Sequence, residues 1–147
     1  MIELAMVGFL IQAGTTPAVT IGDIRMHLFY AETGRLSRDI SPPNAFTGWN
    51  TIIGEGDAEE NANDLAVVVE LRTNGQQNVP APLTVTVRDA RGRVLGQRRF
   101  PASLTGQNGR AYHLLHLANA TCAGRITVTA TYGGRSRDET LALNCGE

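Results

Sequence analysis

The two cysteines, Cys122 and Cys145, have a spacing that fits a β-hairpin. Gly133-Gly134 is a two-residue turn signal, and alternating apolar and polar residues flank it on both sides. In such a hairpin the numbers of facing residues have a constant sum, which is 267 here, and the two cysteines have this sum. Facing residues have Cα atoms about 4.5–5.5 Å apart, which is within disulfide range. The spacing therefore predicts a Cys122–Cys145 disulfide and an oxidising compartment.

The same alternation predicts where this disulfide lies. Ile126 and Val128 share the face of the cysteines, as does Leu143 on the partner strand. We therefore expect a buried disulfide, which contributes roughly 3 kcal/mol of stability by restricting the unfolded chain. The alternative is a pair of reduced core thiols, which behave as small hydrophobic side chains.

The N-terminal segment carries an apolar run at residues 4–11, which is too short to span a bilayer. Its length fits the hydrophobic part of a secretory signal with cleavage after Ala18, although Glu3 stands where positive charge is expected. We predict a signal peptide or N-terminal tail at residues 1–18, and one domain at 19–147. Together with the disulfide, this indicates a periplasmic or secreted protein without a membrane span.

A long acidic loop lies between residues 41 and 64, and its carboxylate and amide oxygens are the ligand type that calcium prefers. The candidate calcium ligands are Asp57, Glu59, Asn61 and Asp64. The spacing departs from the helix-loop-helix calcium motif, because Ala62 stands where that loop requires glycine. The alternative is a solvated loop that binds no metal. No other cofactor is predicted.

Acidic and basic residues are unevenly spread along the chain. Residues 1–87 have ten acids and four arginines, a net −6, whereas residues 88–147 have nine arginines and four acids, a net +5. Two oppositely charged regions can associate head to tail or bind an anionic polymer, unless the charges alternate in space and cancel. The overall charge of −1 gives no case for nucleic acid as a partner. The candidate binding surface combines the single tryptophan with the arginines of one hairpin: Trp49, Arg88, Arg91, Arg93, Arg98 and Arg99.

Several catalytic chemistries are excluded by composition. All 13 basic side chains are arginines, so no Schiff-base or phosphate-loop lysine exists. No serine lies in a nucleophile-elbow pattern, and the carboxylates of the acidic loop face water, where burial does not tune their pKa. His113 and His116 lie on opposite faces of a predicted strand, which does not suit a shared metal. We therefore predict a non-enzymatic protein. The arginine usage is typical of a GC-rich bacterial gene.

These residues are positioned by short segments with period-two alternation and turn residues between them. The pattern predicts an all-β, antiparallel two-sheet sandwich of immunoglobulin-like size, with a small β-barrel as the alternative. Two glycine turns, at residues 32–36 and 90–94, predict tight hairpins, and residues 51–53 are a candidate edge strand. The eight predicted strands are 21–31, 35–40, 65–72, 83–88, 93–100, 110–117, 125–132 and 137–145.

The sequence thus predicts a secreted or periplasmic sandwich that works by binding or assembly, with a protein partner or self-association. One alternative is a subunit of a pilus, cell-surface or virion-like assembly, which the charge distribution favours. Another is a calcium-dependent adhesion or carbohydrate-binding module that uses the acidic loop.

Overall fold

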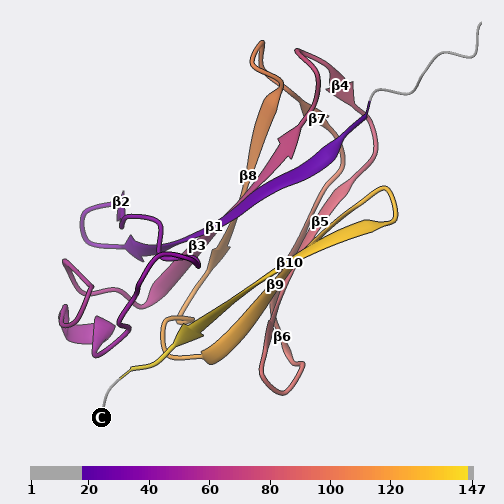
Figure 1. Cartoon of the computed structure of the whole chain (residues 1–147). Helices are drawn as coiled ribbons and strands as arrows, with labels where there is room; N and C mark the ends of the chain where they lie inside the picture. The colour runs from indigo at the N-terminus through magenta and orange to yellow at the C-terminus, as the bar shows by residue number, and fades with distance from the viewer. Residues whose placement is uncertain (1–17, 146–147) are drawn as a thin grey trace, which may run out of the picture.

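A computed structural model describes residues 18–145, and they form two packed antiparallel sheets (Figure 1). Sheet 1 has the strand order β2-β1-β3-β8 and sheet 2 the order β10-β9-β5-β6. The strands of sheet 1 are β1 (Thr20–Tyr30), β2 (Arg35–Leu36), β3 (Asp64–Arg72) and β8 (Arg110–Leu117). Those of sheet 2 are β5 (Leu83–Asp89), β6 (Val94–Phe100), β9 (Gly124–Tyr132) and β10 (Arg135–Leu143). The predicted all-β antiparallel sandwich is confirmed.

The core lies between the two sheets and follows the alternation of the sequence. Each strand turns every second side chain inward, so that branched and long apolar residues of both sheets meet. The fully buried residues of sheet 1 include Met26, Leu28, Leu65, Val67, Val69 and Leu71. Those of sheet 2 include Leu83, Val85, Val87, Ile126, Val128 and Leu143.

One edge of sheet 1 is finished by side chains instead of a strand. The predicted strand 35–40 pairs as a strand only at Arg35–Leu36. Beyond it, Ser37 Oγ accepts a hydrogen bond from the Leu28 amide at 2.9 Å, and Asp39 Oδ1 accepts one from the Met26 amide at 3.3 Å. These short polar side chains replace backbone carbonyls as acceptors, which ends the regular ladder.

The opposite edges of the sheets, β6 and β8, approach each other closely. A side chain at Gly96 would collide with Leu117, so glycine permits the approach. Arg98 Nη1 donates to the Leu114 carbonyl at 3.2 Å, which connects the two strands across this edge.

Two local elements differ from the prediction. Residues 51–53 form a 3-10 turn, η1 (Thr51–Ile53), between left-handed Asn50 and Gly54, so the predicted edge strand is wrong. A two-stranded ribbon, β4 (Asn78–Val79) with β7 (Ser103–Leu104), was not predicted, because two-residue strands show no alternation. The predicted tight hairpins at 32–36 and 90–94 are present. The predicted signal segment lies, except for Ala18, outside the described residues.

Candidate binding site at one end of the sandwich

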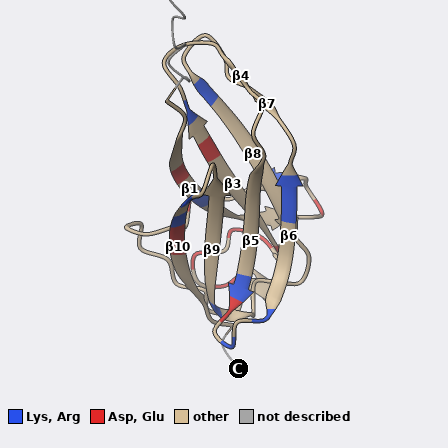
Figure 2. Cartoon of the chain, turned by 90° about the vertical axis from the view of Figure 1, so that its right-hand side faces the viewer, with Lys and Arg blue, Asp and Glu red and all other residues tan. Residues whose placement is uncertain are grey.

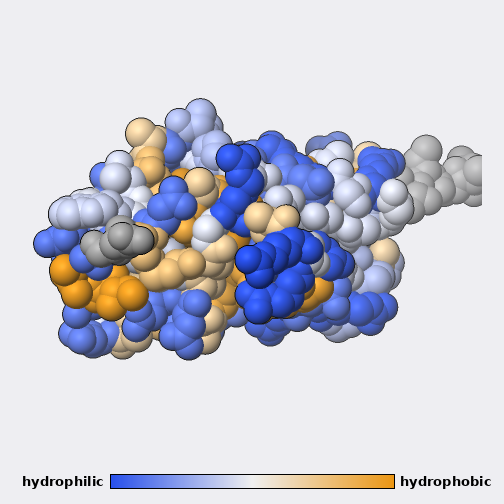
Figure 3. Space-filling view, turned by 90° about the horizontal axis from the view of Figure 1, so that it is seen from below, coloured by the Kyte–Doolittle hydropathy of each residue, from blue (hydrophilic) through white to orange (hydrophobic). Residues whose placement is uncertain are grey.

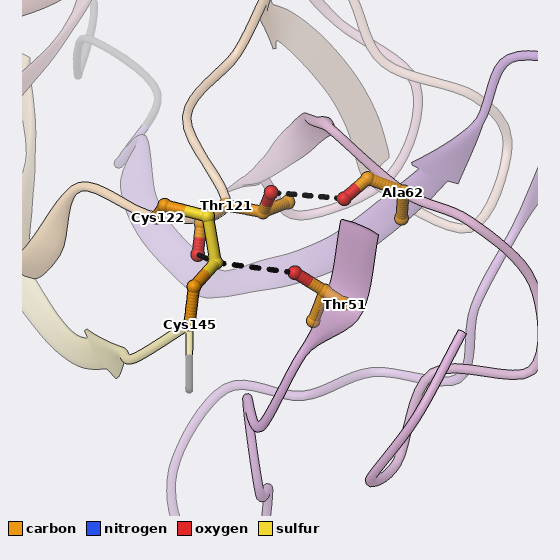
Figure 4. The surroundings of a disulfide bond; sticks show 5 residues. All are labelled: Thr51, Ala62, Thr121, Cys122 and Cys145. Atoms are coloured by element: carbon orange, nitrogen blue, oxygen red, sulfur yellow. Dashed lines mark hydrogen bonds between the residues drawn. A yellow bond between two sulfur atoms is a disulfide. The ribbon is translucent and has the colours of Figure 1, made fainter. Parts of the chain in front are cut away.

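The cysteines form the predicted disulfide, with Cα atoms 5.0 Å apart (Figure 4). The β9–β10 ladder has the predicted register, from Tyr132 opposite Arg135 to Gly124 opposite Leu143. The expectation of a buried disulfide is wrong, because Cys122 is exposed and Cys145 only half-buried. The ladder ends before the cysteines, so the bridge closes the end of the sandwich instead of filling its core.

The disulfide contacts the long loop between residues 41 and 63 through Thr51. Thr51 is fully buried, and its hydroxyl lies 3.5 Å from Cys145 Sγ (Figure 4). Its carbonyl accepts a hydrogen bond from the Ala62 amide at 2.8 Å, and the Ala62 carbonyl accepts one from Thr121 Oγ1 at 2.9 Å. One arm of the loop is thereby attached to Cys145 through Thr51, and the other is attached through Ala62 to the segment that carries Cys122.

Hydrogen bonds within the loop define its conformation. The Asp57 carboxylate accepts from the Thr47 amide, and the Asp57 amide donates to the Thr47 carbonyl at 3.1 Å. Gly56 has φ 71°, and a Cβ there would lie 2.8 Å from the Trp49 carbonyl, so only glycine fits. The Tyr30 hydroxyl accepts from the Glu59 amide at 3.1 Å, which fastens the loop to β1.

Three large apolar side chains of this ordered loop face solvent. Trp49 is 51%, Ile52 47% and Ile53 57% exposed, and we call these three residues the apolar tip. Figure 3 shows hydrophobic surface gathered at this end of the molecule. A shallow groove of about 280 Å³ adjoins Trp49 and is also lined by Phe46 and Cys145. Clustered exposed apolar residues on a fixed loop are typical of an interaction site.

The four candidate calcium ligands do not converge. Asp57 faces Arg38 at 3.5 Å, and Glu59 faces Arg35 at 2.7 Å. Asn61 is exposed. Asp64 accepts from the Asn119 amide at 3.0 Å and contacts His116 Nε2 at 2.8 Å, and these two hydrogen bonds lower the pKa of Asp64. Among residues 18–145 no three His, Cys, Asp or Glu side chains form a group that could hold a metal.

The arginines of the candidate surface spread over the whole β5–β6 hairpin. Arg88, Arg91 and Arg93 lie around its turn, which reaches the same end of the sandwich as the 41–63 loop (Figure 1). Arg93 pairs with Asp89 at 3.0 Å. The other two, Arg98 and Arg99, lie further along β6. The structure therefore does not bring the five arginines together into one patch with Trp49.

The charge asymmetry of the sequence is partly cancelled in space. Three of the four arginines in the acidic first part pair with nearby carboxylates, namely Arg35, Arg38 and Arg72. Arg137 of the basic second part lies 3.6 Å from Asp23. Figure 2 accordingly shows acidic and basic segments interspersed.

A second apolar surface, which no sequence pattern revealed, lies on the outer face of sheet 1. It is a groove of about 450 Å³, which we call the sheet-1 groove. Its lining residues are Phe29, Gly34, Leu36, Ala66, Leu114 and His116. They come from β1, the β1–β2 turn, β2, β3 and β8, so only the strand order assembles them. The sequence signal that was available for this groove is the alternation within each strand, which places these side chains on the outer face of the sheet.

A serine–histidine contact joins β7 to β8. Ser103 Oγ lies 2.7 Å from His113 Nε2, a geometry that can activate a nucleophile. Ser103 is only 8% exposed, and no carboxylate contacts His113 among the described hydrogen bonds. Burial, together with the charge of Arg98, lowers the pKa of His113. The pair fastens the β4–β7 ribbon to sheet 1.

Comparison with known proteins gives no family. No family model matches the chain, and no curated protein matches it. Among solved structures, a β-glucuronidase from Bifidobacterium dentium, complexed with coumarin-3-O-glucuronide, aligns with 85% of this chain at 13% identity and TM-score 0.43. The aligned part is 18% of that enzyme. The ligand-binding region of serine-glutamate repeat protein A from Enterococcus faecium aligns over 56% of this chain and 83% of its own, at 8% identity and TM-score 0.34. Neither likeness bears on the function proposed below.

Proposed function

We propose that this domain is a non-enzymatic, extracytoplasmic binding module whose protein partner contacts the apolar tip. The observation that carries the proposal is the exposure of Trp49, Ile52 and Ile53 on a loop held in one conformation. Because the loop is already ordered, binding costs little conformational entropy, and burial of three large side chains stabilises the complex.

The disulfide supports the extracytoplasmic part of the proposal. Disulfides persist in oxidising compartments, and both cysteines of the chain are used in this one. No helix among the described residues is long and apolar enough to cross a membrane. The absence of lysine and the burial of Ser103 support a role without catalysis.

The test compares a tip variant with a matched control. The tip variant is Trp49→Ala/Ile52→Ser/Ile53→Ser. The control, Val94→Ser/Leu104→Ser, removes two other exposed apolar side chains, which are 45% and 65% exposed. Proteins captured from the cell-envelope fraction by the wild type are purified, and their Kd values are measured against all three proteins.

We expect the control to bind like the wild type and the tip variant to bind at least about tenfold more weakly, with an unchanged melting temperature. Equal binding by the tip variant would exclude the apolar tip as the contact site.

A further inference from the structure

The sheet-1 groove has a small floor between two apolar walls. Ala66 of β3 forms the floor, and the pairing places it directly between His27 of β1 and His116 of β8. Leu36 and Leu114, on opposite walls, are 42% and 41% exposed. Because Ala66 is smaller than the histidines on the two neighbouring strands, it leaves a recess that can hold a large apolar side chain.

Beside each of the two apolar surfaces lies one charged residue without a described ion-pair partner, and these two charges are opposite. Residues 49–63 around the apolar tip contain four carboxylates and no basic residue. Among the described ion pairs, Glu55 in this segment has no partner. On β1, Arg25 lies two residues before His27 and on the same face of sheet 1. Its guanidinium carbon lies 5.2 Å from the centre of the Tyr112 ring. Arg25 too has no carboxylate partner among the described ion pairs. An unpaired negative charge thus borders the tip and an unpaired positive charge borders the groove.

The tip loop and the groove adjoin the same hairpin. On one side of the β1–β2 turn, Thr33 Oγ1 donates to Glu60 at 2.8 Å and Arg35 pairs with Glu59 at 2.7 Å. On the other side, Gly34 and Leu36 line the groove. A twofold axis beside this hairpin can therefore place each tip against the groove of the other copy, which gives a closed dimer.

We propose that the sheet-1 groove receives the apolar tip of a second copy of this chain, with Glu55 of each copy facing Arg25 of the other. This inference rests on the proposed function, because it names the partner of the apolar tip. The apolar contacts supply the binding free energy, and the charge pair sets the orientation of the two copies.

The single tryptophan of the chain reports directly on this contact. Trp49 faces water in the monomer, so its emission shifts to shorter wavelength when the tip enters an apolar groove. We expect this shift as the concentration rises from nanomolar to high micromolar, together with a dimer in sedimentation velocity. Leu114→Glu, in the groove, should abolish both signals although it leaves Trp49 in place, whereas Leu104→Glu on β7 should preserve both.

A charge exchange tests the orientation without removing apolar contacts. Arg25→Glu and Glu55→Arg each create a repulsion in both contacts of a homodimer and should weaken it about tenfold. Mixing the two variants creates only opposite-charge contacts, so a heterodimer with near wild-type affinity should form. The double variant Arg25→Glu/Glu55→Arg should recover as well.

A wild-type protein that stays monomeric, a dimer that tolerates Leu114→Glu, or charge variants that do not rescue each other would each overturn the proposal. None of these results removes the proposed binding function, because a tip-dependent partner from the cell envelope is measured independently on the monomer. Loss of that partner binding with an intact dimer would overturn the envelope-protein partner and leave the dimer standing.

Discussion

The outer faces of the two sheets differ sharply, although their inner faces form one common core. Sheet 2 covers its outer face with hydroxyl and amide groups that bond one another. Thr127 and Thr140 hydroxyls lie 3.2 Å apart across β9 and β10, and Gln97 Nε2 donates to Thr86 Oγ1 at 2.8 Å. Sheet 1 instead exposes Tyr112 and other apolar side chains to water. A core needs only the inner face of each sheet, so the outer face is where two similar sheets diverge toward different contacts.

The sheets also differ in what reinforces them. Sheet 2 ends in the disulfide, whereas sheet 1 carries a buried carboxylate, Glu70, which is 2% exposed. Glu70 accepts hydrogen bonds from Arg72 Nε at 2.9 Å and from the Asp23 amide at 3.2 Å, and Arg110 Nε lies at 3.3 Å. Burial alone raises the pKa of Glu70, but these hydrogen bonds and the two arginine charges outweigh it, so the pKa is lowered.

Removal of the disulfide should have the largest effect on stability. The bridge closes a sequence separation of 23 residues, so Cys122→Ser/Cys145→Ser should lower the free energy of unfolding by about 3 kcal/mol. Urea unfolding measures the change, and wild-type protein with reductant should match the variant. A loss under about 1 kcal/mol would show that sheet 2 does not depend on its bridge.

Neutralising the buried carboxylate should have the next largest effect. Glu70→Gln leaves two arginines without their common partner and should lower the free energy of unfolding by about 2 kcal/mol at pH 7. Because the pKa of Glu70 is lower in the folded than in the unfolded state, the wild type holds this stability above about pH 4.3 and loses it as the pH falls further. The stability difference between the two proteins should therefore shrink between pH 5 and pH 3.

The matched control for this variant is on sheet 2. Asp138 is exposed on β10 and belongs to no described ion pair, so Asp138→Asn should change the stability by less than about 0.5 kcal/mol. Equal losses for Asp138→Asn and Glu70→Gln would show that the ion cluster does not distinguish sheet 1.

Polar substitution on the two outer faces should have the smallest effect on stability. Leu36→Ser/Leu114→Ser should lower the free energy of unfolding by only about 1 kcal/mol, because about two-fifths of each side chain is already exposed to water. It should, however, reduce binding of an apolar fluorescent dye to the native protein. Thr129→Ser on sheet 2 should leave dye binding unchanged, and reduced binding there as well would contradict the assignment of the apolar surface to sheet 1.

The sequence predicted the strands well where alternation continues for seven residues or more. The turn at Gly133-Gly134 also fixed the β9–β10 register and, through it, the disulfide. Segments shorter than this were missed or misassigned, because two or three residues do not define a period. Ser37 and Asp39 ended the predicted strand 35–40 through side-chain hydrogen bonds, which depend on β1 lying beside them.

The candidate site was predicted only in part. Trp49 stood out as the single tryptophan in a long loop, but the sequence does not show that Trp49 is exposed while Thr51, two residues later, is buried. The sheet-1 groove and the burial of Glu70 depend on which strands are neighbours in the sheet. Alternation places Glu70 and Leu114 on an outer face and does not show what surrounds them there.

The acceptors Ser37 and Asp39 also bear on how copies of this chain can aggregate. Strand exchange and fibril growth need an edge whose backbone donors and acceptors are open to an incoming chain. On β1 the amides of Leu28 and Met26 are already held by these side chains, while Arg98 occupies the Leu114 carbonyl on β8. These contacts occupy part of the hydrogen-bonding edge at each border of sheet 1, so an apolar face can remain open to water with a reduced risk of amyloid-like growth.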